Sequence, residues 1–334
     1  MKQYQHSKPT MLVAACAVAM AGLVASANVQ AADWPERTVT IVVPYPAGGA
    51  TDHFGRAMAQ GLEGPLEQSV IVENRAGAGG AVGMGHVARA KADGYTLGLG
   101  AIGTQTINQY LYEELPYDAE NDFEPVALIA STPNVLSVAP SSPWETLEDI
   151  IEAAKAAQEK GEPLSYGSPG VGSSVHLTSE YLQKLADIEL LHVPFKGVAN
   201  SLPAVANGEV DLLFDNLAGS LGQIQSGELI RGVAQTGANR NPEAEDMPTF
   251  IESGVDLDVS SWFALYAPAG TPQDVIDTLI DASKQTLQEP EIIARIHSLG
   301  AEPGTLFGQE LTDYEIAQRE VWSTLIKEEN IKLE

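Results

Sequence analysis

Two glycine-rich segments, each placed between an apolar strand-like run and an amphipathic helical pattern, constrain the fold of this chain most. They are residues 44–52 (PYPAGGATD) and residues 167–176 (GSPGVGSSVH). Strand, glycine turn and helix in succession form the repeating unit of α/β folds with a parallel sheet. Each turn also leaves backbone N–H groups free at the positive end of a helix dipole, which favours an anion. The sequence therefore predicts an α/β fold with two anion-binding turns.

Residues 1–32 predict a signal peptide, so we leave them out of the fold. Lys2 and Lys8 precede a small apolar run at residues 11–24, which is too short to span a bilayer. Small residues then offer cleavage after Ala27, Ala31 or Ala32. We therefore expect an exported protein.

The only cysteine, Cys16, lies inside this signal segment. The residues before it imitate a lipoprotein acylation site, but cleavage there would leave an apolar run of only about five residues, below the usual minimum of ~7. Lipidation is therefore the minor alternative. Without cysteine the exported chain has no disulfide and no thiol nucleophile, so its stability must come from a large apolar core.

The rest of the chain, roughly 300 residues, is long enough for two domains. We expect one lobe from residues 33–131 and 258–334, and a second lobe from residues 132–257. Strands are predicted at residues 38–43, 70–72, 95–99, 126–130, 135–138, 164–166, 190–193, 212–214, 230–234 and 262–267. The first crossing between lobes falls near Pro133, and residues 262–267 return the chain to the first lobe.

Acidic residues dominate the charge, with 45 Asp and Glu against 18 Lys and Arg and a formal net charge of −27. They are scattered over predicted helices and loops, which is typical of a solvated surface. Nucleic acid is excluded as a partner by this charge. An anion site on such a chain must depend on local N–H and hydroxyl donors.

A set of short motifs in a fixed order resembles one known family. The motifs are residues 43–49 (VPYPAGG) with Asp52, 72–75 (VENR) before 77–80 (GAGG), 93–97 (DGYTL), 192–197 (HVPFKG), Asp211 with 214–216 (FDN), and 267–272 (APAGTP). Together they resemble the Bug-type (TctC) periplasmic receptors of tripartite tricarboxylate transporters, over nearly the whole exported chain. The chain departs from the family pattern at Ala47, His53, Ala76 and Phe195, which bears on the identity of the ligand.

The resemblance implies a two-lobed α/β periplasmic binding protein of type II, the Venus-flytrap kind, with two crossing strands at the hinge. It implies that an organic carboxylate, a di- or tricarboxylate, is held in the cleft and delivered to a membrane permease. The expected location is the periplasm. We expect a monomer with no cofactor, no metal and no catalytic residue.

The candidate ligand-binding residues come from the two glycine segments and from two further strand ends. Gly48, Gly49, Gly170 and Gly172 allow a close approach of ligand to backbone, and nearby hydroxyls add donors. The full set is Tyr45, Ala47, Gly48, Gly49, Thr51, Asp52, Gly103, Thr104, Ser168, Gly170, Gly172, Ser173, Ser174, His176, Asp215 and Asn216. Several have a purely structural alternative: Asp52 and Ser174 as helix caps, Tyr45 and His176 as core residues.

Two other function classes remain open from the sequence. An exported hydrolase would use Ser173 or Ser174 with His176, although no G-x-S-x-G elbow surrounds either serine. A sensor that signals to a membrane kinase would share the same binding site. The dinucleotide pattern at residues 98–103 follows a later strand of its lobe than a cofactor site requires, so we expect no nicotinamide cofactor.

Overall fold

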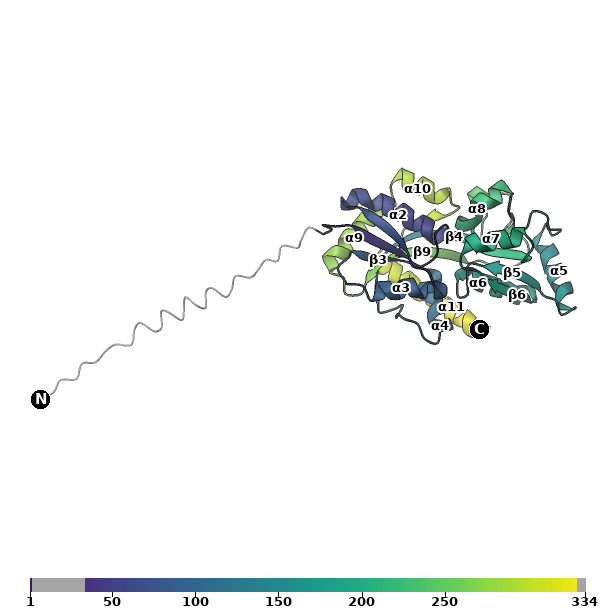
Figure 1. Ribbon diagram of the computed structural model, residues 1–334, viewed down its shortest axis with the longest axis horizontal. Helices are drawn as coiled ribbons and strands as arrows, with labels where there is room; N and C mark the ends of the chain where they lie inside the picture. The colour runs from purple at the N-terminus through teal and green to yellow at the C-terminus, as the bar shows by residue number, and fades with distance from the viewer. Residues whose placement is uncertain (2–33, 329–334) are drawn as a thin grey trace.

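The structure is a computed structural model that describes Met1 and residues 34–328. The predicted cleavage sites and Cys16 lie outside the described residues. The described chain forms two α/β lobes side by side, with β4 (Phe123–Val138) and β9 (Ser260–Pro268) passing between them (Figure 1). Within residues 34–328, no helix combines the length and apolar character needed to cross a membrane.

The first lobe contains a sheet in the order β2-β1-β3-β9-β4. β1 (Val39–Val43) pairs in parallel with β2 (Val70–Asn74) and β3 (Thr96–Ala101), whereas β9 (Ser260–Pro268) runs antiparallel to β3 and β4. A short strand, β10, also pairs with β4. The remaining elements of this lobe are α2 (Ala50–Leu66), α3 (Ala81–Ala88), α4 (Asn108–Leu111), α9 (Gln273–Thr286), α10 (Pro290–His297), α11 (Gln309–Glu328), β10 (Glu302–Pro303), a 3-10 turn (Ala78–Gly80) and a π-helical turn (Gly103–Ile107).

The second lobe repeats this plan in the order β6-β5-β7-β4, with β8 also paired to β4. β5 (Leu164–Ser168) pairs in parallel with β6 (Leu190–Pro194) and β7 (Leu212–Asn216), and β8 (Arg231–Gln235) runs antiparallel to β4. Its helical elements are α5 (Leu147–Gln158), α6 (Ser174–Ala186), α7 (Val198–Ala206), α8 (Leu217–Ser226) and a 3-10 turn (Pro242–Ala244). Each glycine segment therefore joins a parallel strand to a helix, as predicted.

β4 (Phe123–Val138) is one continuous strand of 16 residues, so the prediction of two strands separated by Pro133 was wrong. Up to Pro133 the strand pairs with β9, and from Asn134 it pairs with β7. Pro133 lies at this change of partner, where a missing N–H interrupts the ladder least. A single strand thus carries the sheet from one lobe into the other.

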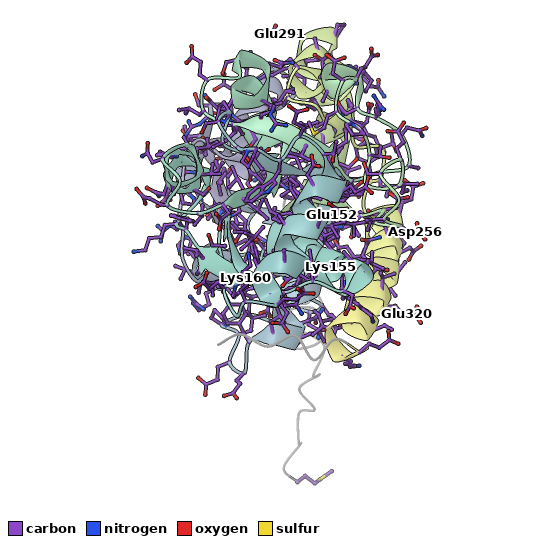
Figure 2. The ribbon with its side chains drawn as sticks, turned by 90° about the vertical axis from the view of Figure 1, so that its right-hand side faces the viewer. Glu152, Lys155, Lys160, Asp256, Glu291 and Glu320 are labelled. Atoms are coloured by element: carbon purple, nitrogen blue, oxygen red, sulfur yellow. The ribbon has the colours of Figure 1, made fainter. Side chains whose placement is uncertain are left out.

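Charged side chains stand around the outside of the molecule, both acidic and basic, as Figure 2 shows at the end formed by the second lobe. The exposed charged residues labelled in Figure 2 are Glu152, Lys155, Lys160 and Asp256 of the second lobe and Glu291 and Glu320 of the first. Acidic and basic groups are interspersed, and Glu152 and Lys155, for example, lie one turn apart on α5. This view agrees with the scattered, solvated acidic surface predicted from the sequence.

Candidate functional site

One pocket lies between the lobes at a point where four helices begin. α2 starts there from the first lobe, and α6, α7 and α8 start there from the second. Three of these helices lack a side-chain hydrogen bond at the N-cap: Gly49, Gly197 and Asn216. The described residues that line the pocket include no lysine or arginine. Converging helix N-termini with free N–H groups favour an anion even without a cationic side chain.

The first glycine turn is held from behind by Asp52. Its carboxylate accepts hydrogen bonds from the Gly48 N–H at 3.0 Å, from Arg56 Nε at 3.0 Å and from Asn74 Nδ2 at 3.0 Å. Burial alone would raise the pKa of Asp52, but the contacts with Arg56, Asn74 and Gly48 lower it below its usual value. Asp52 therefore fixes the shape of the turn, while Thr51 faces the pocket.

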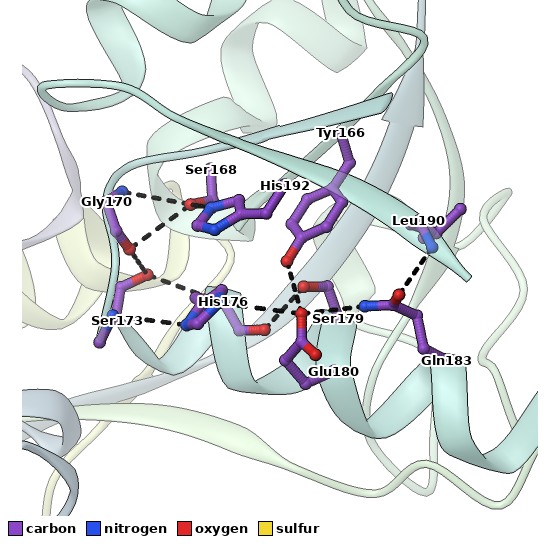
Figure 3. Close-up of polar contacts among 11 residues, drawn as sticks. Tyr166, Ser168, Gly170, Ser173, His176, Ser179, Glu180, Gln183, Leu190 and His192 are labelled. Atoms are coloured by element: carbon purple, nitrogen blue, oxygen red, sulfur yellow. Dashed lines mark hydrogen bonds and ion pairs between the residues drawn. The ribbon is translucent and has the colours of Figure 1, made fainter. Parts of the chain in front are cut away.

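The second glycine turn rests on side chains of β5, β6 and α6 (Figure 3). Ser173 caps α6 by accepting from the His176 N–H at 3.2 Å, and its own hydroxyl donates to the Gly170 carbonyl at 2.8 Å. The Ser168 hydroxyl contacts His192 Nε2 at 2.7 Å and accepts from the Gly170 N–H at 3.2 Å. These bonds fix the turn in the shape that it presents to the pocket.

A ring stack supports this turn from below. His176 lies on His192 with ring centroids 4.3 Å apart, and His192 lies on Tyr166 at 4.7 Å. His176 Nδ1 accepts from the Gly172 N–H at 3.4 Å, and its Nε2 is 3.8 Å from Glu180 Oε1. Burial, with a smaller contribution from His192, lowers the pKa of His176 to about 3, and burial lowers that of His192 to about 4. Both imidazoles are therefore neutral at physiological pH.

A buried polar network forms where the strands cross between the lobes. Asn216 Nδ2 donates to Asn134 Oδ1 at 2.7 Å and to the Ser261 hydroxyl at 2.8 Å, and that hydroxyl contacts the Ser174 hydroxyl at 2.7 Å. The four side chains belong to β7, β4, β9 and α6. The Ser261 hydroxyl also contacts Asn134 Oδ1 at 2.7 Å, so the network joins the two crossing strands to each other and to the pocket residues Asn216 and Ser174.

Asp215 is the carboxylate that lines the pocket. It is 3% exposed, and it accepts a hydrogen bond from the Ser220 hydroxyl at 2.5 Å. Burial raises the pKa of Asp215 to about 7, although the bonds from Ser220 and the Asn216 N–H act in the opposite direction. Because the group is partly protonated at neutral pH, it repels a bound anion less than an ordinary aspartate would.

The structure brings together most of the predicted site residues. Those that line the pocket are Tyr45, Ala47, Gly49, Thr51, Gly103, Ser173, Ser174, Asp215 and Asn216. Those that do not line it are Gly48, Asp52, Thr104, Ser168, Gly170, Gly172 and His176. Most members of this second group shape the turns: Thr104, for example, is fully buried and bonds through its hydroxyl to the Ala101 carbonyl at 3.0 Å.

Sequence reasoning missed several residues of the pocket. They are Pro46, Ala50, Ala101, Pro169, Val175, Gly197, Val198 and Phe263. Gly197 and Val198 begin α7, and the signal was present in the chain as a glycine directly before an apolar helical run. Phe263 lies in a strand that was predicted to return to the first lobe, but nothing local shows which of its residues faces the pocket.

Two α/β lobes joined by crossing strands, with a pocket between them, define a two-lobed binding protein of the type II periplasmic kind. The family model described as "Tripartite tricarboxylate transporter family receptor" matches residues 54–331. The chain belongs to this family, as its motifs predicted.

Individual relatives agree with this assignment. A protein of Pseudomonas sp. (strain P51) named "UPF0065 protein in tcbD-tcbE intergenic region" is 33% identical over 93% of this chain and 92% of its own length. The structure of R. palustris Rpa4515 with adipate has a TM-score of 0.85 at 36% identity, covering 90% of this chain and all of that one. MatC of Rhodopseudomonas palustris, with bound malate, has a TM-score of 0.82 at 29% identity, covering 88% and 100%.

Proposed function

We propose that this protein captures an organic carboxylate in the pocket between its lobes and delivers it to a membrane permease of the tripartite tricarboxylate type. The observation that carries the proposal is the meeting of four helix N-termini, from both lobes, in a pocket without lysine or arginine. Related structures hold adipate and malate, both of which are carboxylates. Export by the N-terminal signal, a periplasmic location and a monomeric state are parts of the same proposal.

Capture depends on contacts that one ligand makes with both lobes. Thr51 and Gly103 approach it from the first lobe, and Ser173, Ser174 and Asn216 approach it from the second. A ligand shifts the balance between open and closed lobes only by its different affinity for the two states. We place the hinge where β4 changes partners, close to the predicted lobe boundaries at residues 131/132 and 257/258. No cofactor or metal has a role in this mechanism.

The geometry favours a receptor over a hydrolase. The Ser173 hydroxyl donates to the Gly170 carbonyl, and the Ser174 hydroxyl is hydrogen-bonded to the Ser261 hydroxyl. Neither hydroxyl contacts an imidazole. The serine that does contact an imidazole is Ser168, on His192, and it is fully buried and does not line the pocket. A nucleophile needs both a base and an open face toward the substrate, and no serine of the pocket has both.

Thr51→Val is the sharpest test of the receptor site. Within residues 34–328 no hydrogen bond involves the Thr51 hydroxyl, although the residue lines the pocket. Removing this donor is expected to weaken carboxylate binding about tenfold, the usual value of a hydrogen bond to a charged group. Isothermal titration calorimetry against adipate, malate and citrate measures the change.

Thr278→Val, at an exposed site on α9, is the matched control and should bind like the wild type. Equal affinity of the Thr51 and Thr278 variants would contradict the site. A Ser173→Ala, Ser174→Ala double variant tests the other lobe and should lose affinity, with a stability cost of ~1 kcal/mol from the lost helix cap. Turnover of any ester or amide by the wild type that this double variant abolishes would instead support the hydrolase.

A sensor would bind the same ligand, so transport must be tested separately. Cells that lack this receptor should lose uptake of the identified carboxylate, and the wild-type gene should restore it. Normal uptake with a loss of ligand-dependent gene expression would support the sensor alternative.

A further inference from the structure

A second cavity adjoins the pocket between the lobes. We call the first the inner pocket and the second the outer chamber; their volumes are about 50 Å³ and about 510 Å³. Five residues line both: Tyr45, Pro46, Pro169, Ser173 and Gly197. The outer chamber extends from these shared walls between the segment around Gly79 in the first lobe and Phe195 in the second. The two spaces are therefore neighbouring parts of one cleft.

The inner pocket is the smaller part of this cleft, with about a tenth of the volume of the outer chamber. Its walls are formed at the helix N-termini, so the charged head group of a ligand belongs there. The outer chamber is the larger space that adjoins it and can receive the rest of the ligand.

The walls of the outer chamber are mainly apolar. Aromatic rings come from Tyr45, Tyr112 and Phe195, and the Tyr45 hydroxyl is occupied by the Gly79 carbonyl at 3.2 Å. Among the described residues that line it, the only charged one is Lys196, whose side chain is exposed. Such walls suit methylene groups or a ring rather than a cluster of carboxylates. Lys196 can meet one further anionic group at the rim.

Glycines bring these walls together. A Cβ at Gly79 would lie 2.8 Å from the Tyr112 hydroxyl and 2.9 Å from the Val171 carbonyl. A side chain there would therefore have to displace both the Tyr112 hydroxyl and the backbone of the second glycine turn. The close approach at Gly79 therefore fixes the distance between the two lobes at this side of the outer chamber.

We propose that the ligand is an extended carboxylate, with its head group in the inner pocket and an apolar body of several methylenes or a ring in the outer chamber. This inference rests on the proposed function and narrows its ligand class. It disfavours compact, highly charged acids such as citrate, whose remaining carboxylates would have to enter apolar space. Ala76 and Phe195, two positions at which the chain departs from its family pattern, both line the outer chamber.

A chain-length series tests the proposal. Calorimetric affinities are measured for α,ω-dicarboxylates from four to ten carbons, for the matching monocarboxylates, for phenylpropionate and for citrate. We expect affinity to rise about fourfold with each buried methylene until the chamber is filled. Lys196→Met should weaken the longer dicarboxylates and leave the monocarboxylates unchanged.

Val171→Phe, at the wall of the outer chamber, should abolish the increase of affinity with chain length while leaving the affinity for acetate and propionate unchanged. Phe195→Ala is an independent test, because the larger chamber should let affinity keep increasing to longer chains. A thermal melt of each variant verifies that it is folded. Affinity that is independent of chain length, or strongest for citrate, would overturn the proposal while leaving the receptor function standing. Absence of binding by every carboxylate would overturn both.

Discussion

Replacing Gly172 by leucine is expected to abolish ligand binding while the protein stays folded. Gly172 has φ +77°, which only glycine adopts readily, and a Cβ there would lie 3.0 Å from Asn108 Oδ1 and 3.5 Å from the Tyr112 ring. Both neighbours belong to the first lobe, whereas Gly172 belongs to the second. The leucine side chain would therefore hold the lobes apart. We expect affinity to fall at least about 100-fold, or ~2.7 kcal/mol, by calorimetry.

Gly208→Leu is the matched control for this substitution. Gly208 has φ +75° and no atom within 4 Å of an added Cβ, so the variant carries the same backbone strain without touching the other lobe. Both variants should lose about 1–2 kcal/mol of stability from the positive φ. Only Gly172→Leu should lose binding. If both variants kept wild-type affinity, close contact of the lobes at Gly172 would not be needed for capture.

Gly49→Trp tests the wall of the pocket itself, on the side of the first lobe. Gly49 has no positive φ, and an added Cβ would lie 3.9 Å from Val198 Cγ1 across the cleft. The backbone tolerates the change, so stability should stay within about 0.5 kcal/mol of the wild type. The indole would occupy the space of the ligand head group, and binding should again be lost in a titration.

Much of the fold could be predicted because its signals are local. The apolar run before each glycine turn predicted a parallel strand, and the structure has β1 and β5 there. The cap of α6 is Ser173, the neighbour of the serine for which a capping role was considered, and it accepts from the His176 N–H. α9 begins at Gln273, and the Thr271 hydroxyl just before it donates to the Pro268 carbonyl. The continuity of β4 through Pro133 could not be predicted, because it depends on partners from three distant segments.

In the candidate site, too, the residues set by local sequence could be predicted and those set by long-range packing could not. Residues of the turns themselves, such as Gly49 and Ser173, could be predicted from the chain, and they line the pocket. Whether Thr51 or its neighbour Asp52 faces the pocket depends on Asn74, which is 22 residues away and holds the Asp52 carboxylate. Phe263 could not be predicted, because long-range packing of β9 brings it to the pocket. The role of each residue in binding stays a prediction until the titrations are made.

His176→Gln is expected to make the protein more stable than the wild type in acid. The pKa of His176 is lowered by burial from 6.5 to about 3, so the native state binds fewer protons than the unfolded chain between these pH values. The stability that the neutral imidazole contributes is therefore complete above pH 6.5 and is lost as the pH falls. Relative to the variant, the wild type should lose ~1.4 kcal/mol of unfolding free energy per pH unit between pH 6 and 4. Urea unfolding at each pH measures the difference.

Glutamine is the right replacement because its amide oxygen can still accept from the Gly172 N–H. His192→Gln should show the same direction of change over a narrower pH range, because burial lowers the pKa of His192 only to about 4. Equal pH slopes for wild type and His176→Gln would show that the buried imidazole is protonated without cost. That outcome would contradict the neutral ring stack as the support of the second turn.

Glu315→Gln should change the pH dependence of the unfolding free energy in the opposite direction, in the same urea experiment. Glu315 lies on α11, where its buried carboxylate accepts hydrogen bonds from Tyr266 and Arg319. Burial raises its pKa from 4.5 to about 7 despite these contacts, so the native state binds more protons than the unfolded chain across that range. The wild type should therefore gain stability relative to this variant as the pH falls from 7 to 4.5, whereas it loses stability relative to His176→Gln. In the wild type the buried carboxyl and the buried imidazole act in opposite directions between pH 6.5 and 4.5, so the two single replacements should change the pH dependence of stability with opposite signs.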